Sequence, residues 1–157
     1  MPIHELTNYR HRGARALVLL HEKALRDILP AWRAAKAARV ALPPTTNAAY
    51  ASLETVLQHV LRAARSMMMT LCEKLELPDP AIDEAPEPSR VEKEAERYIE
   101  HLLARWRIPL AGVDEKSFDL TYRTRNGEER SIMATLEHAA MHPMRHRFQL
   151  EELAEGR

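Results

Sequence analysis

The chain is poor in the residues that mark several other classes of protein. It has one cysteine, Cys72, only four glycines, and aromatic residues make up 5% of its 157 positions. A single cysteine excludes an internal disulfide framework and a zinc site built on CxxC pairs. Few glycines and aromatics argue against a β-sandwich, whereas the abundant Ala, Leu, Arg and Glu are typical of a helical protein.

The chain also lacks an excess of charge and a long apolar run. Lys plus Arg and Asp plus Glu both number 23, so the formal net charge is zero. A nucleic-acid-binding protein normally carries a basic surplus, so we expect no nucleic-acid partner. The apolar run near the N-terminus, residues 16–20, is too short for a signal peptide or a membrane span. The sequence therefore predicts a single cytoplasmic domain, residues 1–157, with no membrane partner and enough chain to bury a core.

Apolar residues recur at helical spacing in four segments, which predicts an all-α four-helix bundle. The expected helices cover residues 8–38, 47–75, 89–107 and 131–154. Leu17, Leu20, Ala24, Ile28 and Trp32 are the expected inner face of the first helix. Pro30 should kink or restart that helix, and Ser89 with Glu92 reads as a capping box for the third.

Two of the expected connections are long. "ELPDPAIDEAPEPSR" holds four prolines in fifteen residues and should cross the surface as a stiff link. Before the last helix, Phe118, Leu120 and Tyr122 alternate with polar residues and lead to Asn126-Gly127. That pattern predicts a short β-hairpin or flap.

The last expected helix, in "TLEHAAMHPMRHRFQLEEL", carries His138, His142 and His146 at four-residue spacing. Residues four apart lie one turn apart on nearly the same face, so His142 and His146 can bind one ion. Neutral imidazole is a good ligand for zinc, nickel or ferrous iron. A further ligand must come from elsewhere, and His59 is the best candidate because small residues surround it on its helix face: Ser52, Thr55, Val56, Ala63 and Ser66.

Each of these features also has a structural interpretation. An HxxxH pair alone is weak evidence in a helical chain with eight histidines. For His59 taken by itself, a half-buried histidine bonded to one carbonyl is the favoured interpretation. Pro143 predicts a kink or bulge between the paired histidines, or only shapes how the helix end packs.

The stretches "SLETVLQHVL" and "LEHAAMHPMRHRFQL" together resemble the DinB/YfiT-like superfamily of metalloenzymes. The resemblance covers about residues 12–153 and implies a four-helix bundle. It places the family's first metal ligand on His59 and its paired ligands on His142 and His146. His138 matches a further family histidine and Gln149 the end of the family's Arg-Gly-Gln tail. Phe148 departs from that pattern, because it stands where the family usually has glycine.

The resemblance implies a divalent-metal-dependent enzyme acting on a small-molecule substrate. Members include transferases and isomerases that use low-molecular-weight thiols, and others look like hydrolases. Zinc and nickel are the expected ions, with iron as a third. Three facial histidines leave positions open on an ion, as in catalytic sites. We therefore expect His59, His142 and His146 to be metal ligands, with His138, Arg145 and Gln149 around them.

Other residues in the sequence carry weaker functional signals. His21 is expected at the edge of the core, and Cys72 and Met67–Met69 inside it. Arg62, Arg65 and Arg145 would bind an anionic substrate or pair with Glu54 and Glu137 on a solvated face.

The alternative function is a non-catalytic, metal-binding helical module that forms a homodimer, with Met67–Met69 and Trp106 at the interface. A third hypothesis is a pH sensor built from His138, His142 and His146.

Overall fold

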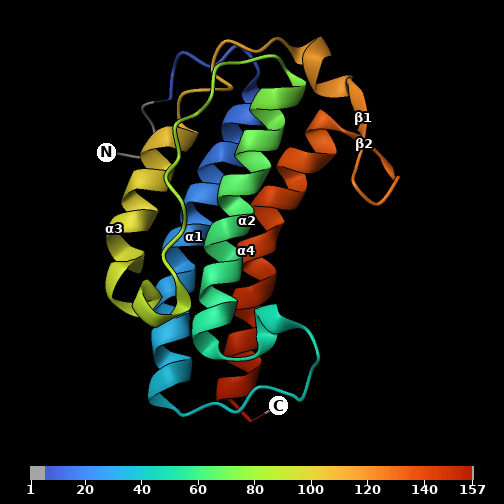
Figure 1. Ribbon diagram of the computed structural model, residues 1–157. Helices are drawn as coiled ribbons and strands as arrows, with labels where there is room; N and C mark the ends of the chain where they lie inside the picture. The colour runs from blue at the N-terminus through green and yellow to red at the C-terminus, as the bar shows by residue number, and fades with distance from the viewer. Residues whose placement is uncertain (1–5, 157) are drawn as a thin grey trace.

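The computed structural model describes residues 6–156 as four long α-helices with a small hairpin before the last one, which confirms the predicted all-α four-helix bundle. In Figure 1, α1 and α4 run downward while α2 and α3 run upward, so the order is not a simple alternation. The parallel pair α2 and α3 is joined by the proline-rich connection, which runs back down along the bundle from the end of α2 to the start of α3 (Figure 1). The helices are α1 (Arg12–Ala37), α2 (Leu53–Lys74), α3 (Pro88–Trp106) and α4 (Ile132–Ala154).

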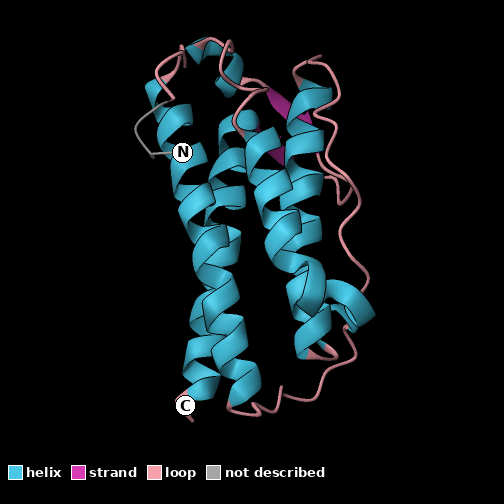
Figure 2. Cartoon of the chain, turned by 90° about the vertical axis from the view of Figure 1, so that its left-hand side faces the viewer, coloured by secondary structure: helices cyan, strands magenta, loops and turns pink. Residues whose placement is uncertain are grey.

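Short elements occupy the connections between the helices. The 3₁₀ turn η1 (Ala48–Tyr50) precedes α2, and η2 (Glu115–Asp119) follows α3. Strands β1 (Thr121–Arg123) and β2 (Glu129–Ser131) pair antiparallel, and the hairpin stands at one end of the bundle (Figure 2). Gly127, at φ 82°, donates its N–H to the carbonyl of Thr124 at 2.9 Å and closes the turn. The predicted hairpin is therefore present.

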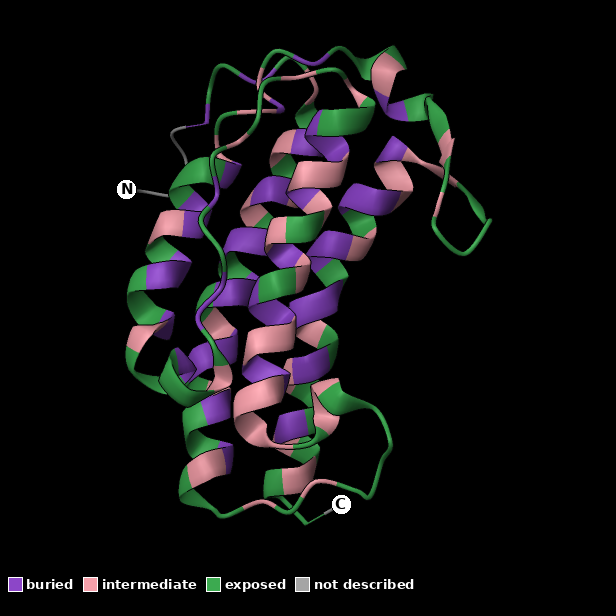
Figure 3. Cartoon of the chain, in the orientation of Figure 1, coloured by how far each residue is buried: buried purple, intermediate pink, exposed green. Residues whose placement is uncertain are grey.

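The core lies along the bundle axis, where the inner faces of all four helices are buried (Figure 3). Two tryptophans are its largest fully buried residues, and each indole N–H crosses to another helix. Trp32 donates to the carbonyl of Leu53 at 2.6 Å, and Trp106 to that of Ala64 at 3.1 Å. These bonds satisfy the polar end of a large apolar ring and tie α1 and α3 to the backbone of α2.

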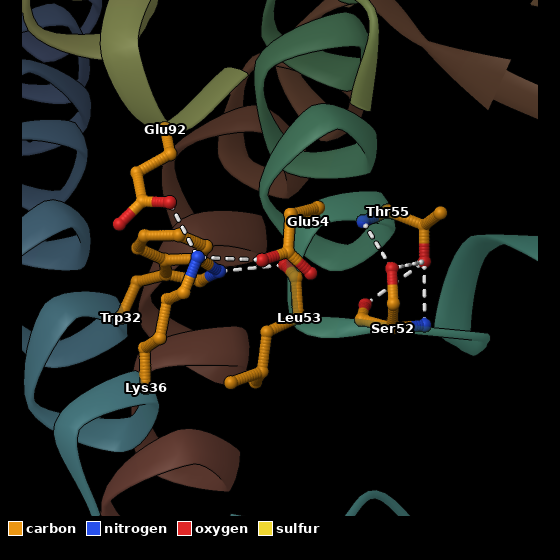
Figure 4. Close-up of polar contacts among 7 residues, drawn as sticks. All are labelled: Trp32, Lys36, Ser52, Leu53, Glu54, Thr55 and Glu92. Atoms are coloured by element: carbon orange, nitrogen blue, oxygen red, sulfur yellow. Dashed lines mark hydrogen bonds and ion pairs between the residues drawn. The ribbon is translucent and has the colours of Figure 1, made fainter. Parts of the chain in front are cut away.

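The start of α2 is firmly defined. Ser52 and Thr55 form a reciprocal capping box, with the Ser52 hydroxyl accepting the Thr55 N–H at 3.1 Å. Beside it, Lys36 of α1 contacts Glu54 of α2 at 2.8 Å and also pairs with Glu92 of α3 (Figure 4). α1, α2 and α3 thus meet at the end of the bundle where the chain passes from η1 into α2.

Several local expectations were wrong. The chain does not restart at Pro30, because α1 runs unbroken through it with the ring exposed at the surface. α3 begins at Pro88, whose missing N–H is harmless at a first helical position, and no side chain caps it, so Ser89 is not a cap. Leu20 is 48% exposed, and Phe118 belongs to η2 and the core rather than to a strand.

None of the helices within residues 6–156 has the length and apolar character needed to cross a membrane.

Candidate metal centre

Three of the predicted ligands converge between α2 and α4. The capping box that starts α2 places His59 nearly two turns into that helix. Ser131 caps α4 by accepting the N–H of Ala134 at 3.0 Å, and His142 and His146 follow on one face of that helix. One ring nitrogen from each of the three lies within 4.8 Å of the other two. We call these three residues the histidine cluster.

The spacing of the histidine cluster suits a metal ion. The Nε2 atoms of His59 and His142 are 3.1 Å apart. Two nitrogens bound to one zinc ion at 2.0–2.1 Å lie about 2.9–3.4 Å apart for angles of about 90–110° at the ion. This separation suits two ligands of one ion, and in the absence of an ion it is that of a hydrogen bond between the two rings. The rings stand edge to face, with centroids 4.6–5.2 Å apart.

One member of the histidine cluster, His146, lacks the partners that a structural histidine would have. His146 is 1% exposed, and neither of its ring nitrogens has a hydrogen-bond partner of good geometry within residues 6–156, although the side chain of Gln149 lies near enough to act on its pKa. Leaving a buried polar atom unpaired costs about 1–3 kcal/mol, so such atoms usually have a function or a missing partner. A metal ion bound by the three imidazoles would satisfy His146. The donor set and the orphaned atoms thus fit an ion.

Burial keeps the cluster neutral. Desolvation lowers the pKa of His142 to about 3, helped by the charges of His146 and His59. Desolvation likewise lowers the pKa of His146 to about 4. The pKa of His59 is lowered by burial first, and then by the guanidinium groups of Arg145 and Arg62. Neutral imidazoles offer the lone pairs that metal binding requires.

Two cavities border the cluster on different sides of η1. The first, about 440 Å³, touches His146 and has mostly apolar walls from the α1–α2 connection and the end of α4, including Leu42, Pro43, Leu150 and Leu153. The second, about 670 Å³, touches His59 and is more polar. Tyr50 of η1 lines the first cavity, with its ring centroid 5.7 Å from that of His59 and 5.8 Å from that of His146.

The predicted surrounding residues lie close by but outside the cluster. The His138 ring is 5.9 Å from that of His142, and its nitrogens do not belong to the group that could share an ion. Arg145 is exposed, yet its charge lowers the pKa of His59 and of His138. Gln149 lines the apolar cavity beside His146.

Pro143 and Phe148 are the two residues of α4 that the sequence singled out as unusual. α4 is α-helical throughout, so the bulge predicted at Pro143 is absent. Phe148 is 58% exposed, and its ring contacts the guanidinium of Arg147 at 5.4 Å. Its side chain therefore points to the surface and does not fill the space beside the cluster.

His21 and Cys72, for which the sequence favoured packing roles, are both buried outside the site. His21 is fully buried, not at the core edge, and stacks on Trp106 with ring centroids 3.6 Å apart. Cys72 is a buried free thiol, and burial raises its pKa to about 11. A thiol with such a pKa is a poor nucleophile at neutral pH.

Sequence reasoning missed Tyr50 and Arg125, which belong to connections. Tyr50 lies in the α1–α2 connection, and Arg125, in the turn of the hairpin, lines the polar cavity. The only signal for Tyr50 was an aromatic residue close before the predicted ligand helix. Arg125 carried no signal at all, because turn residues are commonly charged.

No family model matches the chain, and no curated protein or solved structure matches it significantly.

Proposed function

We propose that this protein is a divalent-metal-dependent enzyme of the DinB/YfiT-like group whose ion is held by His59, His142 and His146. The observation that carries the proposal is the meeting of three buried histidines within 4.8 Å of one another, with both nitrogens of His146 unpartnered in the described chain. The resemblance of "SLETVLQHVL" and "LEHAAMHPMRHRFQL" to the family supports the same ligand set. Zinc or nickel is the proposed ion, and iron a third choice.

The surroundings favour catalysis over a purely structural site. Three protein ligands leave a position free on a tetrahedral ion, whereas structural zinc sites use four. A bound divalent ion supplies a Lewis acid that activates a thiol or a water as a nucleophile. Tyr50 and the apolar wall around His146 would restrict solvent on one side, and the polar cavity beside His59 would admit substrate.

The two cavities support a reaction with two reactants. Their walls differ in chemistry, and each touches a different histidine of the cluster. A transferase that uses a low-molecular-weight thiol needs room for the thiol and for a second molecule. A hydrolase needs room for one substrate and water. We therefore place thiol-dependent transfer first and hydrolysis second.

The decisive experiment measures metal content and metal-dependent turnover together. Untagged protein from zinc- or nickel-supplemented cultures should contain about one ion per chain. With a small thiol and a chromogenic electrophile, turnover should stop on chelation, return on adding the ion, and be absent from His146→Ala. Absence of bound metal together with no thermal shift on adding either ion would sink the proposal. A full complement of metal with no thiol or ester turnover would favour the non-catalytic module.

A further inference from the structure

The polar cavity beside His59 is formed by four separate parts of the chain. The first half of α2 and the turn η1 line it, the proline-rich connection supplies Glu84, and the hairpin supplies Arg125. At about 670 Å³ it falls within the size range of small-molecule sites. Three guanidinium groups and one carboxylate line it: Arg62, Arg65, Arg125 and Glu84.

Most polar side chains in this cavity are already occupied. Arg65 pairs with Glu84 at 3.2 Å and donates its Nε–H to the carbonyl of Ile82 at 2.9 Å. Gln58 donates its amide to the carbonyl of Pro86 at 3.1 Å. These contacts hold the proline-rich connection against α2. They leave Arg62 and Arg125 as the cationic groups available to a ligand.

One of the two expected carboxylate partners, Glu54, is engaged elsewhere. Glu54, which sequence reasoning offered to the arginines of α2, instead contacts Lys36 at 2.8 Å. Within residues 6–156, neither Arg62 nor Arg125 makes an ion pair or a side-chain hydrogen bond. Arg62 is therefore exposed, as expected for a solvated face, but it lacks the expected carboxylate partner. Two unpaired guanidinium groups face one cavity in a chain whose net charge is zero.

Positive charge from arginine side chains also acts on the histidine cluster. The guanidinium groups of Arg145 and Arg62 add to burial in lowering the pKa of His59. Guanidinium groups bind carboxylate and phosphate oxygens in pairs, and a cationic cavity concentrates small anions. An anionic group held by Arg62 and Arg125 would place the rest of its molecule beside His59.

We propose that Arg62 and Arg125 form an anion-binding subsite, so that the substrate of the histidine cluster carries a carboxylate or phosphate group. The subsite itself depends only on the two arginines and the cavity, whereas its assignment to a substrate rests on the proposed metal-dependent function. Carboxylates and phosphates share an oxyanion that accepts two parallel hydrogen bonds from a guanidinium.

The test is calorimetric titration of metal-free, folded protein with inorganic phosphate and, separately, with succinate at matched ionic strength. One anion or both should bind, and the tighter one identifies the oxyanion. Arg62→Gln and Arg125→Gln should each weaken binding by about tenfold, as expected for loss of a charge-assisted pair. Arg105→Gln is the matched control, because Arg105 is exposed on α3 and lines neither cavity beside the cluster.

The outcomes separate this inference from the proposed function. Equal affinity in Arg62→Gln/Arg125→Gln and Arg105→Gln, or no binding of either anion to the native protein, would overturn the subsite. Zinc content of the same variants, measured as purified and before the metal is removed for titration, tests the other proposal, since Arg62→Gln should keep its ion. His146→Ala without zinc but with native phosphate or succinate affinity supports the subsite independently of the metal.

Discussion

Buried histidines occur in two different settings in this bundle. His21 on α1 is fully buried against Trp106, and the histidine cluster lies between α2 and α4. In both places ring nitrogens lack hydrogen-bond partners among the described residues, and burial lowers the pKa, to about 3 for His21 and for His142. The settings differ in what surrounds the nitrogens. His21 meets an aromatic face, whereas His146 meets two other imidazoles and a cavity.

The comparison shows that burial and a perturbed pKa do not by themselves make a metal ligand. Convergence of donors from two helices is the further requirement, and only the cluster meets it within residues 6–156. His21 acts as a flat, neutral packing residue on Trp106, at the cost of its unsatisfied nitrogens.

The largest expected effect is loss of metal on removing one cluster histidine. His146→Ala should reduce bound zinc from about one ion per chain to none, because two imidazoles hold an ion far more weakly than three. His21→Gln is the matched control and should keep the ion. Elemental analysis of both variants measures this. Equal loss of zinc in the two would show that the cluster histidine is no more important for metal binding than His21.

Removing the aromatic partner of His21 should give the next largest effect, on stability alone. Trp106→Ala takes away the stacked ring and the bond to the carbonyl of Ala64, and should lower the free energy of unfolding by about 3–5 kcal/mol. Urea denaturation gives the value. Trp106→Phe, which keeps most of the ring, should lose less. Zinc content per folded chain should stay near one in both, and a parallel loss of zinc would show that the settings are coupled.

Acid should destabilise the protein through His21. Its pKa is lowered to about 3, below the usual value of 6.5, because burial penalises the charged ring. Between these values the unfolded chain binds a proton that the folded chain does not. The contribution is therefore complete above pH 6.5 and is lost as pH falls, at about 1.4 kcal/mol per pH unit. His21→Leu should reduce the slope of the chelated protein by about this amount, as measured by urea denaturation from pH 6.5 to 4.5, while His142 and His146 keep contributing to the slope that remains. An unchanged slope would contradict a buried neutral His21.

The smallest expected effect concerns Phe148. Its ring lies at the surface over Arg147, so Phe148→Gly should leave zinc affinity unchanged within about twofold. Stability should fall by roughly 1 kcal/mol, because glycine is unfavourable inside a helix. Phe148→Ala separates the loss of the ring from the loss of helix propensity. A large change in zinc affinity would show that Phe148 influences the cluster despite its exposure.

The sequence determined the four helices, the hairpin and the histidine pair, because each depends on spacing within a short segment. Period-3.6 apolar patterns, the Asn126-Gly127 turn and the four-residue step from His142 to His146 are local properties. Capping was less certain, since Ser89 has the residue type of a cap but Pro88 begins the helix instead. The choice of His59 as third ligand came from family resemblance and small neighbours.

Only the tertiary structure decided what those helices bring together. The approach of α2 to α4 places His59 within 3.1 Å of His142, and that distance depends on packing across 83 residues of chain. The same packing set His21 on Trp106, pointed Phe148 outward, and placed Arg125 from the hairpin in the cavity beside Arg62. A sequence pattern specifies the face on which a side chain lies, but the long connections decide which faces meet.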